Sequence, residues 1–351
     1  SIVGGDDTRL GNLTPENEGQ SIPTRGGVSL GGMVLDREIY APGSTTDTVG
    51  PDGRLSPATR DRMRRIPTAR NVVSIISVYA QTAAIIWAAV HWGPWAWLPA
   101  FVLMGRAHAQ FASLMHEAAH RLLLRDKRLN DWCGRWLIGY PAFTNTDAYR
   151  RVHMAHHREE FGPHEPDIAL YANYPVSRAS FRRKMWRDAT GRTGLRLLVD
   201  QLRGLRSDVP VVRASQRKIW LVQLLLLGLC IASGHWWVYP LLWLAPFLTV
   251  WRVINRLRSI AEHGGLEASN DRRVATHSVR QHPVARFAMV PFNIGFHLAH
   301  HVDAGVPFRN LPRYHRSLVE SGYVNDRLEY PSYRALWAAL RGARPASSSP
   351  R

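Results

Sequence analysis

Sixteen histidines occur in this chain of 351 residues, and half of them fall in three short stretches. The stretches are HEAAH at 116–120, HMAHH at 153–157 and HLAHH at 297–301. They contain His116, His120, His153, His156, His157, His297, His300 and His301. Since positions i, i+3 and i+4 share one face of a helix, each stretch presents its imidazoles to one point. Neutral imidazole binds iron, zinc, copper and nickel, so the spacing predicts a metal site.

The first stretch alone permits two kinds of metal site. HEAAH matches His-Glu-x-x-His, the zinc-protease signature in which Glu117 would be the general base. A single catalytic zinc takes three protein ligands and keeps one position open. Eight clustered imidazoles would then leave at least five without a role. The full pattern therefore predicts two metal ions.

A ninth histidine and several carboxylates are predicted to complete the site. His263, in IAEHGG at 260–265, follows the last apolar segment and is predicted to be a further ligand. A ligating histidine usually donates its second ring N–H to a carboxylate or a carbonyl. The carboxylates expected in this supporting role are Glu117, Asp167, Glu262 and Asp303. Glu159 and Glu160 are further candidates, for which a surface charge is the alternative interpretation.

Four apolar segments are predicted to position the histidines. They cover about 72–92, 95–115, 219–234 and 237–254, and the first has 21 residues without a formal charge. A helix of about 20 apolar residues spans the hydrocarbon of a bilayer. Arginine and lysine flank the segments on one side, and the two hairpin tips have neither. By the positive-inside rule, both hairpins point out of the cytoplasm.

These features predict an all-α membrane protein, in which two transmembrane hairpins are capped by a cytoplasmic helical domain that carries the histidines. Both termini would be cytoplasmic, and the membrane would be a bacterial inner membrane. The predicted units are an extended, flexible arm (1–60), the membrane domain (61–325), and a C-terminal helix with a flexible tail (326–351). Arg106 and His108 interrupt the second segment and are predicted to line a substrate cavity. The alternative is a soluble protein with two buried hairpins.

The net charge of +18 requires a partner, which could be nucleic acid, anionic lipid or an acidic protein. The stretch 180–206 has the pattern of a helix with arginine on one side and apolar residues on the other. Such a helix can lie on an anionic membrane, which explains much of the charge without nucleic acid. Cys133 and Cys230 form no CxxC pattern, so neither an Fe–S centre nor a disulfide framework is expected.

At these motifs the chain resembles the membrane-bound fatty acid desaturase and hydroxylase family. The resemblance covers about 70–320 and is carried by HEAAH, YRRVHMAHH with HEPDI after it, RLRSIAEHGG, and NIGFHLAHHVDAGVPFRNLPRYH. The first stretch is HxxxH, as in acyl-lipid and bacterial members, and not the HxxxxH of animal acyl-CoA desaturases. The third begins with His297 and not Gln, unlike front-end desaturases. Ser259 stands where the animal enzymes have an Asn.

The resemblance implies four transmembrane helices and a diiron centre held by the eight clustered histidines and His263. That centre would activate O₂ and abstract hydrogen from an unactivated C–H bond, chemistry that redox-inert zinc cannot supply. The implied substrate is a fatty-acyl or lipid-like chain. Electrons would come from a separate protein, because the chain contains no fused rubredoxin, ferredoxin or cytochrome motif. A basic cytoplasmic face would attract an acidic ferredoxin-like donor, which its own reductase would supply.

The predicted activity is therefore that of an O₂-dependent diiron oxidase, with desaturation favoured. Hydroxylation, ketolation and oxidative decarboxylation to a terminal alkene would use the same ligands, because the positioning of the C–H bond decides among them. An intramembrane zinc metalloprotease that uses HEAAH is the alternative from another class. It would need an acidic ligand in a later span, and 219–254 contains no Asp or Glu. A non-catalytic metal-binding membrane protein is the third possibility.

Overall fold

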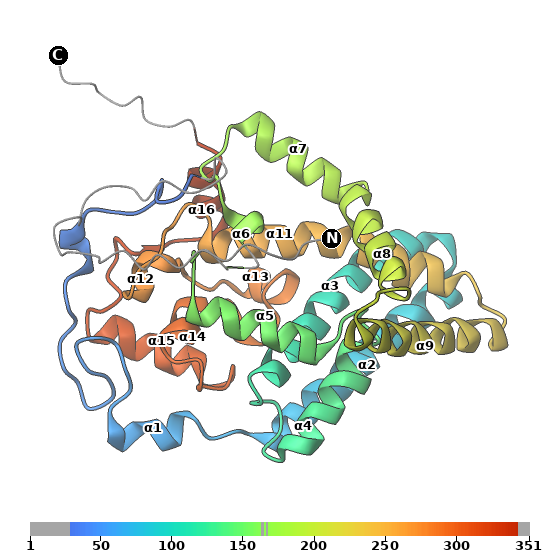
Figure 1. Cartoon of the computed structure of the whole chain (residues 1–351), viewed down its shortest axis with the longest axis horizontal. Coiled ribbons are helices and arrows are strands. Elements are labelled where there is room, and N and C mark those ends of the chain that lie inside the picture. The colour runs from blue at the N-terminus through green and yellow to red at the C-terminus, as the bar shows by residue number, and fades with distance from the viewer. Residues whose placement is uncertain (1–28, 163–164, 166–167, 343–351) are drawn as a thin grey trace.

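The computed structural model of the protein describes residues 29–162, 165 and 168–342, and this part of the chain is mostly helical, with almost no strand (Figure 1). The prediction of a helical protein is confirmed. The described residues contain only two strands, β1 (Ser278–Val279) and β2 (Glu329–Tyr330), which pair in parallel.

The first predicted hairpin is formed by α2 (Thr68–Trp92) and α3 (Pro94–Ala119), which pack along each other. Gly93, with φ 61°, makes the turn, and Pro94 starts α3 at a position where a missing N–H is tolerated. The helix α3 continues past the predicted end at residue 115, so that His116 is helical and His120 is its C-cap. It also packs against α5 (Thr146–Arg158) and α11 (Val250–His263), so it connects the hairpin to the histidine-bearing helices.

The second hairpin has one continuous and one interrupted arm. The continuous arm is α9 (Pro210–Ala232), which starts nine residues before the predicted 219. The return arm is divided into η4 (Tyr239–Leu244, a π-helical turn), α10 (Ala245–Leu248) and α11. The breaks follow from Pro240 and Pro246, which lack an N–H, and from the non-helical backbone at Thr249. The predicted segment 237–254 is thus three helical pieces.

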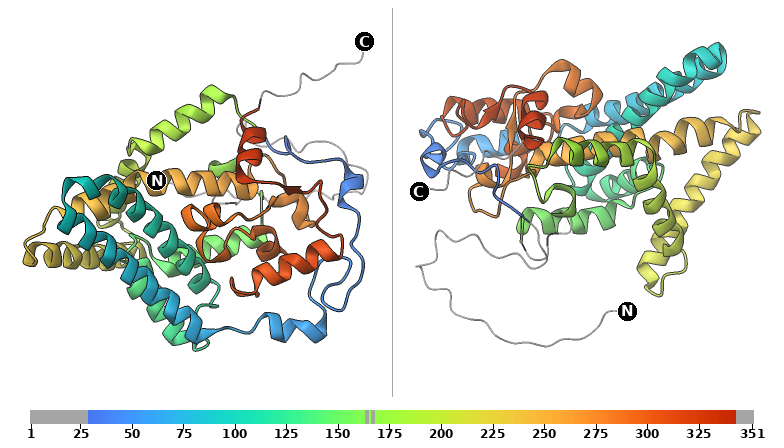
Figure 2. Two further views of the ribbon diagram at one scale, coloured as in Figure 1. Left: turned by 180° about the vertical axis from the view of Figure 1, so that it is seen from behind. Right: turned by 90° about the horizontal axis from the view of Figure 1, so that it is seen from above.

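Two helices of the described chain are long and apolar enough to cross a membrane. They lie in the stretch Pro57–Trp92, which ends with α2, and in Pro210–Ala232. Only 22% and 11% of their most apolar windows are buried, whereas a soluble protein would bury such helices. The hairpin helices extend from one end of the molecule (Figure 2), and Trp95 at a tip is 92% exposed. A count of four spans and the orientation of the hairpins stay predictions.

The remaining helices form a body around the ends of α3 and α11 (Figure 2). They are α1 (Pro57–Met63), α4 (Lys127–Cys133), η3 (Gly134–Gly139, π-helical), α5, α6 (Ile168–Tyr171), α12 (Arg272–Ala275), α13 (Pro283–Ala288), η5 (Pro291–Asn293), α14 (His297–Val302), α15 (Leu311–Glu320) and α16 (Tyr333–Leu340). Residues 29–56 run along this body with one 3-10 helix, η2 (Arg37–Tyr40). Residues 1–28 and 343–351 lie outside the described part, so the flexible arm and tail stay predictions.

The helix predicted over 180–206 is two helices, α7 (Arg178–Ala189) and α8 (Arg192–Gly204). They are separated at Gly191, whose φ of 76° is left-handed. Both present apolar side chains to the outside, since Trp186 is 69% and Leu195 is 56% exposed. That this surface lies on a membrane stays a prediction.

We expect Gly105→Leu to destabilise the protein, because α3 and α11 approach each other closely at this glycine. A Cβ at residue 105 would lie 2.3 Å from Cγ1 and 2.4 Å from Cβ of Val250. Overpacking of this kind costs about 1–3 kcal/mol. Thermal unfolding of the purified protein, followed by circular dichroism, measures the change. Gly228→Leu in α9 is the matched control, since no atom lies within 4 Å of a Cβ there. Equal unfolding midpoints for the two variants would contradict the packing of α3 on α11.

Candidate metal centre

Four helices bring the clustered histidines together. The end of α3 carries His116 and His120, and the last turns of α5 carry the second cluster. The side chain of Asn145 starts α5 by accepting hydrogen bonds from the N–H groups of Asp147 and Ala148. His263 is the last residue of α11, and α14 begins at His297. Three of these elements end at the cluster and one begins there, so the side chains converge from different directions.

Five histidines form the first group, which we call group A. It consists of His116, His120, His153, His157 and His300, whose nearest ring nitrogens all lie within 4.8 Å of one another. The Nε2 atom of His153 is 2.9 Å from that of His120 and 3.1 Å from that of His157. The Nε2 atoms of His157 and His300 are 3.0 Å apart. Two nitrogens bound at right angles to one ion, at about 2.1 Å, are about 3.0 Å apart, so group A has the spacing of a metal site.

Four histidines form the second group, group B. His156, His263 and His301 offer nitrogens within 4.8 Å of one another. The Nε2 atom of His297 lies 3.0 Å from Nε2 of both His263 and His301. Groups A and B adjoin, since the ring centroids of His157 and His301 are 4.3 Å apart. The nine histidines predicted as ligands thus lie in two adjacent groups, and their binding of metal stays a prediction.

The protonation of these rings fits a bound cation. Nδ1 of His263 lies 2.8 Å from the carbonyl oxygen of Ala275, which can only accept, so Nδ1 carries the hydrogen. In the neutral ring Nε2 is then a bare lone pair that faces His297. If Nε2 of His297 carries a hydrogen, it can donate that hydrogen to Nε2 of His263 or to Nε2 of His301, but not to both. Both ring nitrogens of His116 are buried without a hydrogen-bond partner among the described residues. A metal ion in each group would satisfy these lone pairs together.

Burial keeps the imidazoles neutral. It lowers the pKa of His153, His157 and His297 well below the ordinary value, and the neighbouring imidazoles lower it further. Burial also lowers the pKa of His120 to about 4. Since a metal binds the unprotonated ring, these groups are in the binding form at pH 7.

Two further carboxylates contact the ring nitrogens, Glu160 and Glu165. Glu160 contacts Nδ1 of His301 and lies 2.8 Å from Nη1 of Arg272. Burial raises the pKa of Glu160 to about 7, against the opposing effect of Arg272. Glu165 lies 2.9 Å from Nδ1 of His156. Only 5% of Glu160 is exposed, which argues against the alternative of a surface charge. The HEPDI motif, which contains Glu165, could have indicated this supporting role from the sequence.

The predicted carboxylates lie in different surroundings. Glu262 pairs with Arg258 at 2.8 Å, and its Oε1 is 3.8 Å from Nδ1 of His297. Oε1 of Glu117 accepts a hydrogen bond from the N–H of Phe308 at 3.0 Å. Asp303 forms a two-pronged ion pair with Arg64, at 2.8 and 3.0 Å. Asp167 lies outside the described residues. The supporting roles of these groups stay predictions.

The two polar residues inside α3 have partners of their own. Nε2 of His108 lies 3.0 Å from the carbonyl oxygen of Trp243, and its ring packs on Trp243 at a centroid distance of 4.4 Å. Arg106 donates to Gln81, at 2.8 Å, and to the carbonyl oxygen of Phe287, at 2.7 Å. Ser259, on α11, donates to the carbonyl oxygen of Asn255 at 2.8 Å. The predicted cavity-lining role of Arg106 and His108 stays a prediction.

Comparison with known proteins identifies the family. The family model described as fatty acid desaturase matches residues 92–334, which include both histidine groups. This chain belongs to the fatty acid desaturase family. A similar protein is dihydrorhizobitoxine desaturase from Bradyrhizobium elkanii, which is 26% identical over 260 residues. The match covers 68% of this chain and 73% of that protein. The resemblance noted from the motifs is confirmed.

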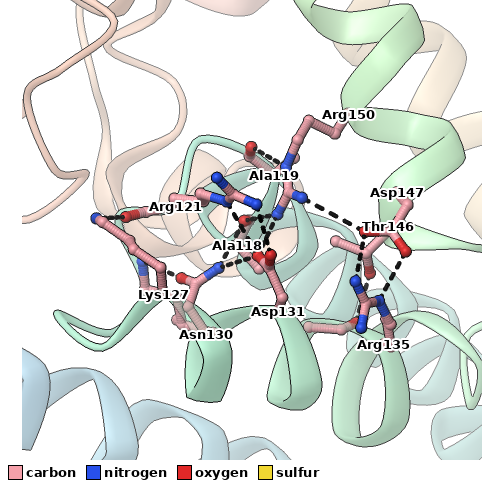
Figure 3. A network of polar contacts seen from close by, with 12 residues as sticks. Ala118, Ala119, Arg121, Lys127, Asn130, Asp131, Arg135, Thr146, Asp147 and Arg150 are labelled. Atoms are coloured by element: carbon pink, nitrogen blue, oxygen red, sulfur yellow. Dashed lines mark hydrogen bonds and ion pairs between the residues drawn. The ribbon is translucent and has the colours of Figure 1, made fainter.

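A polar network holds two of the histidine helices of this desaturase-family protein in register (Figure 3). Arg150, on α5, lies one turn before His153 and donates to the carbonyl oxygens of Ala118 and Ala119 at 3.0 and 2.7 Å. These carbonyls end α3, which carries His116 and His120, so a cation is favourable beside them. Arg150 also pairs with Asp131 at 2.6 Å. It therefore fixes α5 against the end of α3 and sets the geometry of group A.

We expect Arg150→Met to lower the metal content of the purified protein by at least half. The methionine keeps an apolar stem but removes every donor to Ala118, Ala119 and Asp131, which costs about 1.5–3 kcal/mol in a charged network. Metal analysis by mass spectrometry measures the loss. Arg151→Met is the matched control, because the next side chain along α5 is exposed. Full metal content in Arg150→Met would show that the network does not position group A.

Proposed function

We propose that this protein is an integral-membrane, O₂-dependent diiron oxidase that attacks an unactivated C–H bond of a fatty-acyl or lipid-like substrate. Desaturation is the proposed outcome, and hydroxylation, ketolation and decarboxylation to a terminal alkene are the alternatives with the same centre. The observation that carries the proposal is the convergence of nine imidazoles in two adjoining groups. Two iron ions bound there would supply the O₂ activation and C–H cleavage that side chains alone cannot.

The residues of the chain would hold and orient this centre. Groups A and B would each bind one ion through neutral imidazoles. Glu160, Glu165 and the carbonyl of Ala275 face the outer nitrogens of His301, His156 and His263, which favours Nε2 as the binding atom. The largely buried setting of both groups would exclude water from a reactive site.

A zinc protease is supported less well by these contacts. That chemistry would use Glu117 as a general base beside His116 and His120. Instead, Oε1 of Glu117 accepts the N–H of Phe308. Group A also holds five imidazoles, more than a catalytic zinc uses.

Desaturation is preferred because the relative from Bradyrhizobium elkanii is named a desaturase. Its name concerns that protein, and here it supports only the type of reaction. For this chain we propose the substrate class, a lipid-like molecule with an alkyl chain. That class agrees with the exposed apolar helices beside the site.

We propose that both hairpins span a bacterial inner membrane and that the histidines and termini are cytoplasmic. Arginines and lysines lie at the ends of α2, α3, α9 and α11 that are near the body, whereas the hairpin tips have neither. The positive-inside rule then places the body in the cytoplasm. The charge of +18 would be accounted for by lipid and by a protein partner, with no role for nucleic acid.

We expect the purified protein to contain about two iron ions per chain and to convert a lipid-like substrate when O₂ and a reduced donor are supplied. His120→Ala removes a member of group A and should abolish turnover. Iron analysis and mass spectrometry of the products measure both effects, and the mass change separates desaturation from oxygen insertion or loss of CO₂. His91→Ala, in the exposed tip of α2, is the matched control. One zinc per chain, or a fully active His120→Ala enzyme, would overturn the proposal.

An acidic ferredoxin-like protein, reduced by its own reductase, is the proposed electron donor. His120 and His157 are the two members of group A that are not fully buried. Exposed arginines lie close to them in sequence, Arg121 after His120 and Arg158 after His157. A negatively charged donor would therefore be attracted to the exposed edge of the site.

We expect turnover with such a donor to slow several-fold as the salt concentration rises from about 0.05 to 0.5 M, because salt screens this attraction. Steady-state rates at several donor concentrations measure the effect. Turnover driven by a small uncharged reductant is the control and should change little. The same salt dependence with both reductants would contradict charge steering by the protein donor.

A further inference from the structure

A cavity of about 390 Å³ lies beside the α2–α3 hairpin, between α13, η5 and the start of α15. Its lining includes Arg286, Phe287, Phe292, Asn293, Phe308 and Arg309. Neither the histidine groups nor the polar network of Figure 3 includes any of them. The cavity therefore has no role in the function proposed so far.

The cavity is lined by two arginines, Arg286 and Arg309, neither of which forms an ion pair with a carboxylate within the described part of the chain. Arg286 donates to the amide oxygen of Asn293 at 2.7 Å. Arg309 donates to Asn71 at 2.9 Å and to the carbonyl oxygen of Arg70 at 2.7 Å. All these acceptors are neutral, whereas Arg64 and Arg150 each pair with an aspartate. Glu117 interacts electrostatically with Arg309 but forms no ion pair with it. Two guanidinium groups at one cavity, without an ion-paired carboxylate, favour an anionic ligand with a carboxylate or phosphate group.

The backbone at the cavity is held in an unfavourable conformation. Phe292 and Asn293 both have left-handed backbones, with φ 56° and 63°. Asparagine tolerates this region, but for phenylalanine it costs about 1–2 kcal/mol. The conformation places Asn293 between two parts of the cavity wall, because it accepts from Arg286 and donates to the carbonyl oxygen of Phe308 at 3.2 Å. Strain of this kind is typical of ligand-binding sites, and here it orients Arg286.

The helices beside the charged cavity carry exposed apolar side chains. Val284 and Phe287, one turn apart on α13, are 66% and 55% exposed. Val73 and Ile76, near the start of α2, are 64% and 61% exposed. Arg106 of α3 holds α13 against the hairpin through the carbonyl oxygen of Phe287. A small hydrophilic anion would gain nothing from these neighbours, whereas an anion with an alkyl chain would bury apolar area against them.

The cavity is also connected to the histidine groups. The backbone N–H of Phe308 donates to Glu117, the residue after His116 in group A. Asn293 precedes His297 of group B by four residues. Arg286 and Arg309 lie on either side of α14 in the sequence, and α14 carries histidines of both groups. A ligand bound to these two arginines would thus be held close to the ends of the segment that carries those histidines.

We propose that this cavity binds the anionic head group, a carboxylate or phosphate, of the substrate. The inference rests on the proposed oxidase function and narrows its substrate class to anionic amphiphiles. Arg286 and Arg309 would hold the anionic group, and the alkyl chain would leave the cavity along the apolar surface. The head group would then set the position along the chain at which the C–H bond is attacked.

Equilibrium binding to the metal-loaded protein in nanodiscs, without donor or O₂, tests this directly. Three labelled ligands with the same alkyl chain are compared: hexadecanoic acid, hexadecyl lysophosphatidate and neutral hexadecanol. We expect Arg286→Gln to weaken binding of at least one anionic ligand about tenfold, the loss of one charge-assisted contact, while hexadecanol changes less than about twofold. Arg286→Lys should restore part of the affinity. Arg316→Gln, an exposed arginine on α15, is the matched control.

Comparison of the two anionic ligands shows whether the cavity binds a carboxylate or a phosphate head group. A loss confined to hexadecanoic acid identifies a free fatty acid, and a loss confined to the lysophosphatidate identifies a phosphate-bearing lipid. Arg309→Gln should repeat the result, with unfolding followed in parallel because this side chain is half-buried. Equal affinity of wild type and Arg286→Gln for both anions would overturn the inference. Since binding is measured without turnover, this failure is distinct from an absence of oxidase activity.

Discussion

Nine largely buried, neutral imidazoles meet at nitrogen–nitrogen distances of about 3 Å, and one ring hydrogen per imidazole cannot satisfy all of these nitrogens. The closest nitrogens are 2.9–3.1 Å apart, and at His263 the hydrogen is committed to Ala275 on the outer side of the ring. Protonation is opposed by burial and by the other imidazoles. The proposed metal ion in each group would stabilise the arrangement by binding these nitrogens. Much of the fold can be understood as the means of holding these rings in place.

The histidines are separated by as many as 185 residues, from His116 to His301, so long-range contacts must hold them. The helix α3 is central, because it packs on α2, α5 and α11 and ends at the site. Arg150 ties its last carbonyls to α5, and Glu160 joins the end of α5 to His301 on α14. These ionic contacts lie largely out of water. Each would be costly to break singly, since its partner would be left buried and unpaired.

Local patterns in the sequence predicted the helical class, the course of the first hairpin and the nine histidines that the fold brings together. All of these are signals of spacing or of continuous apolarity. The interrupted return arm was not predicted, although Pro240 and Pro246 were visible, because its overall apolarity resembled that of one helix. The role of Arg150 was not predicted, and Glu160 was left open between a supporting role and a surface charge, for a different reason. Their roles depend on partners far away in the chain. A charged residue near a helix end is predicted to be exposed unless its tertiary contact is known.

The two histidine groups differ in their contact with solvent. Group A includes the partly exposed rings of His120 and His157, whereas every member of group B is buried. A chelator or an incoming ion would therefore reach the two positions at different rates. Binding of the two proposed metal ions would then proceed in two stages, with a protein that holds one ion as a distinct species. The proposed ion in group A would exchange first. Inactive preparations of such a protein could then be correctly folded and lack only the more accessible ion.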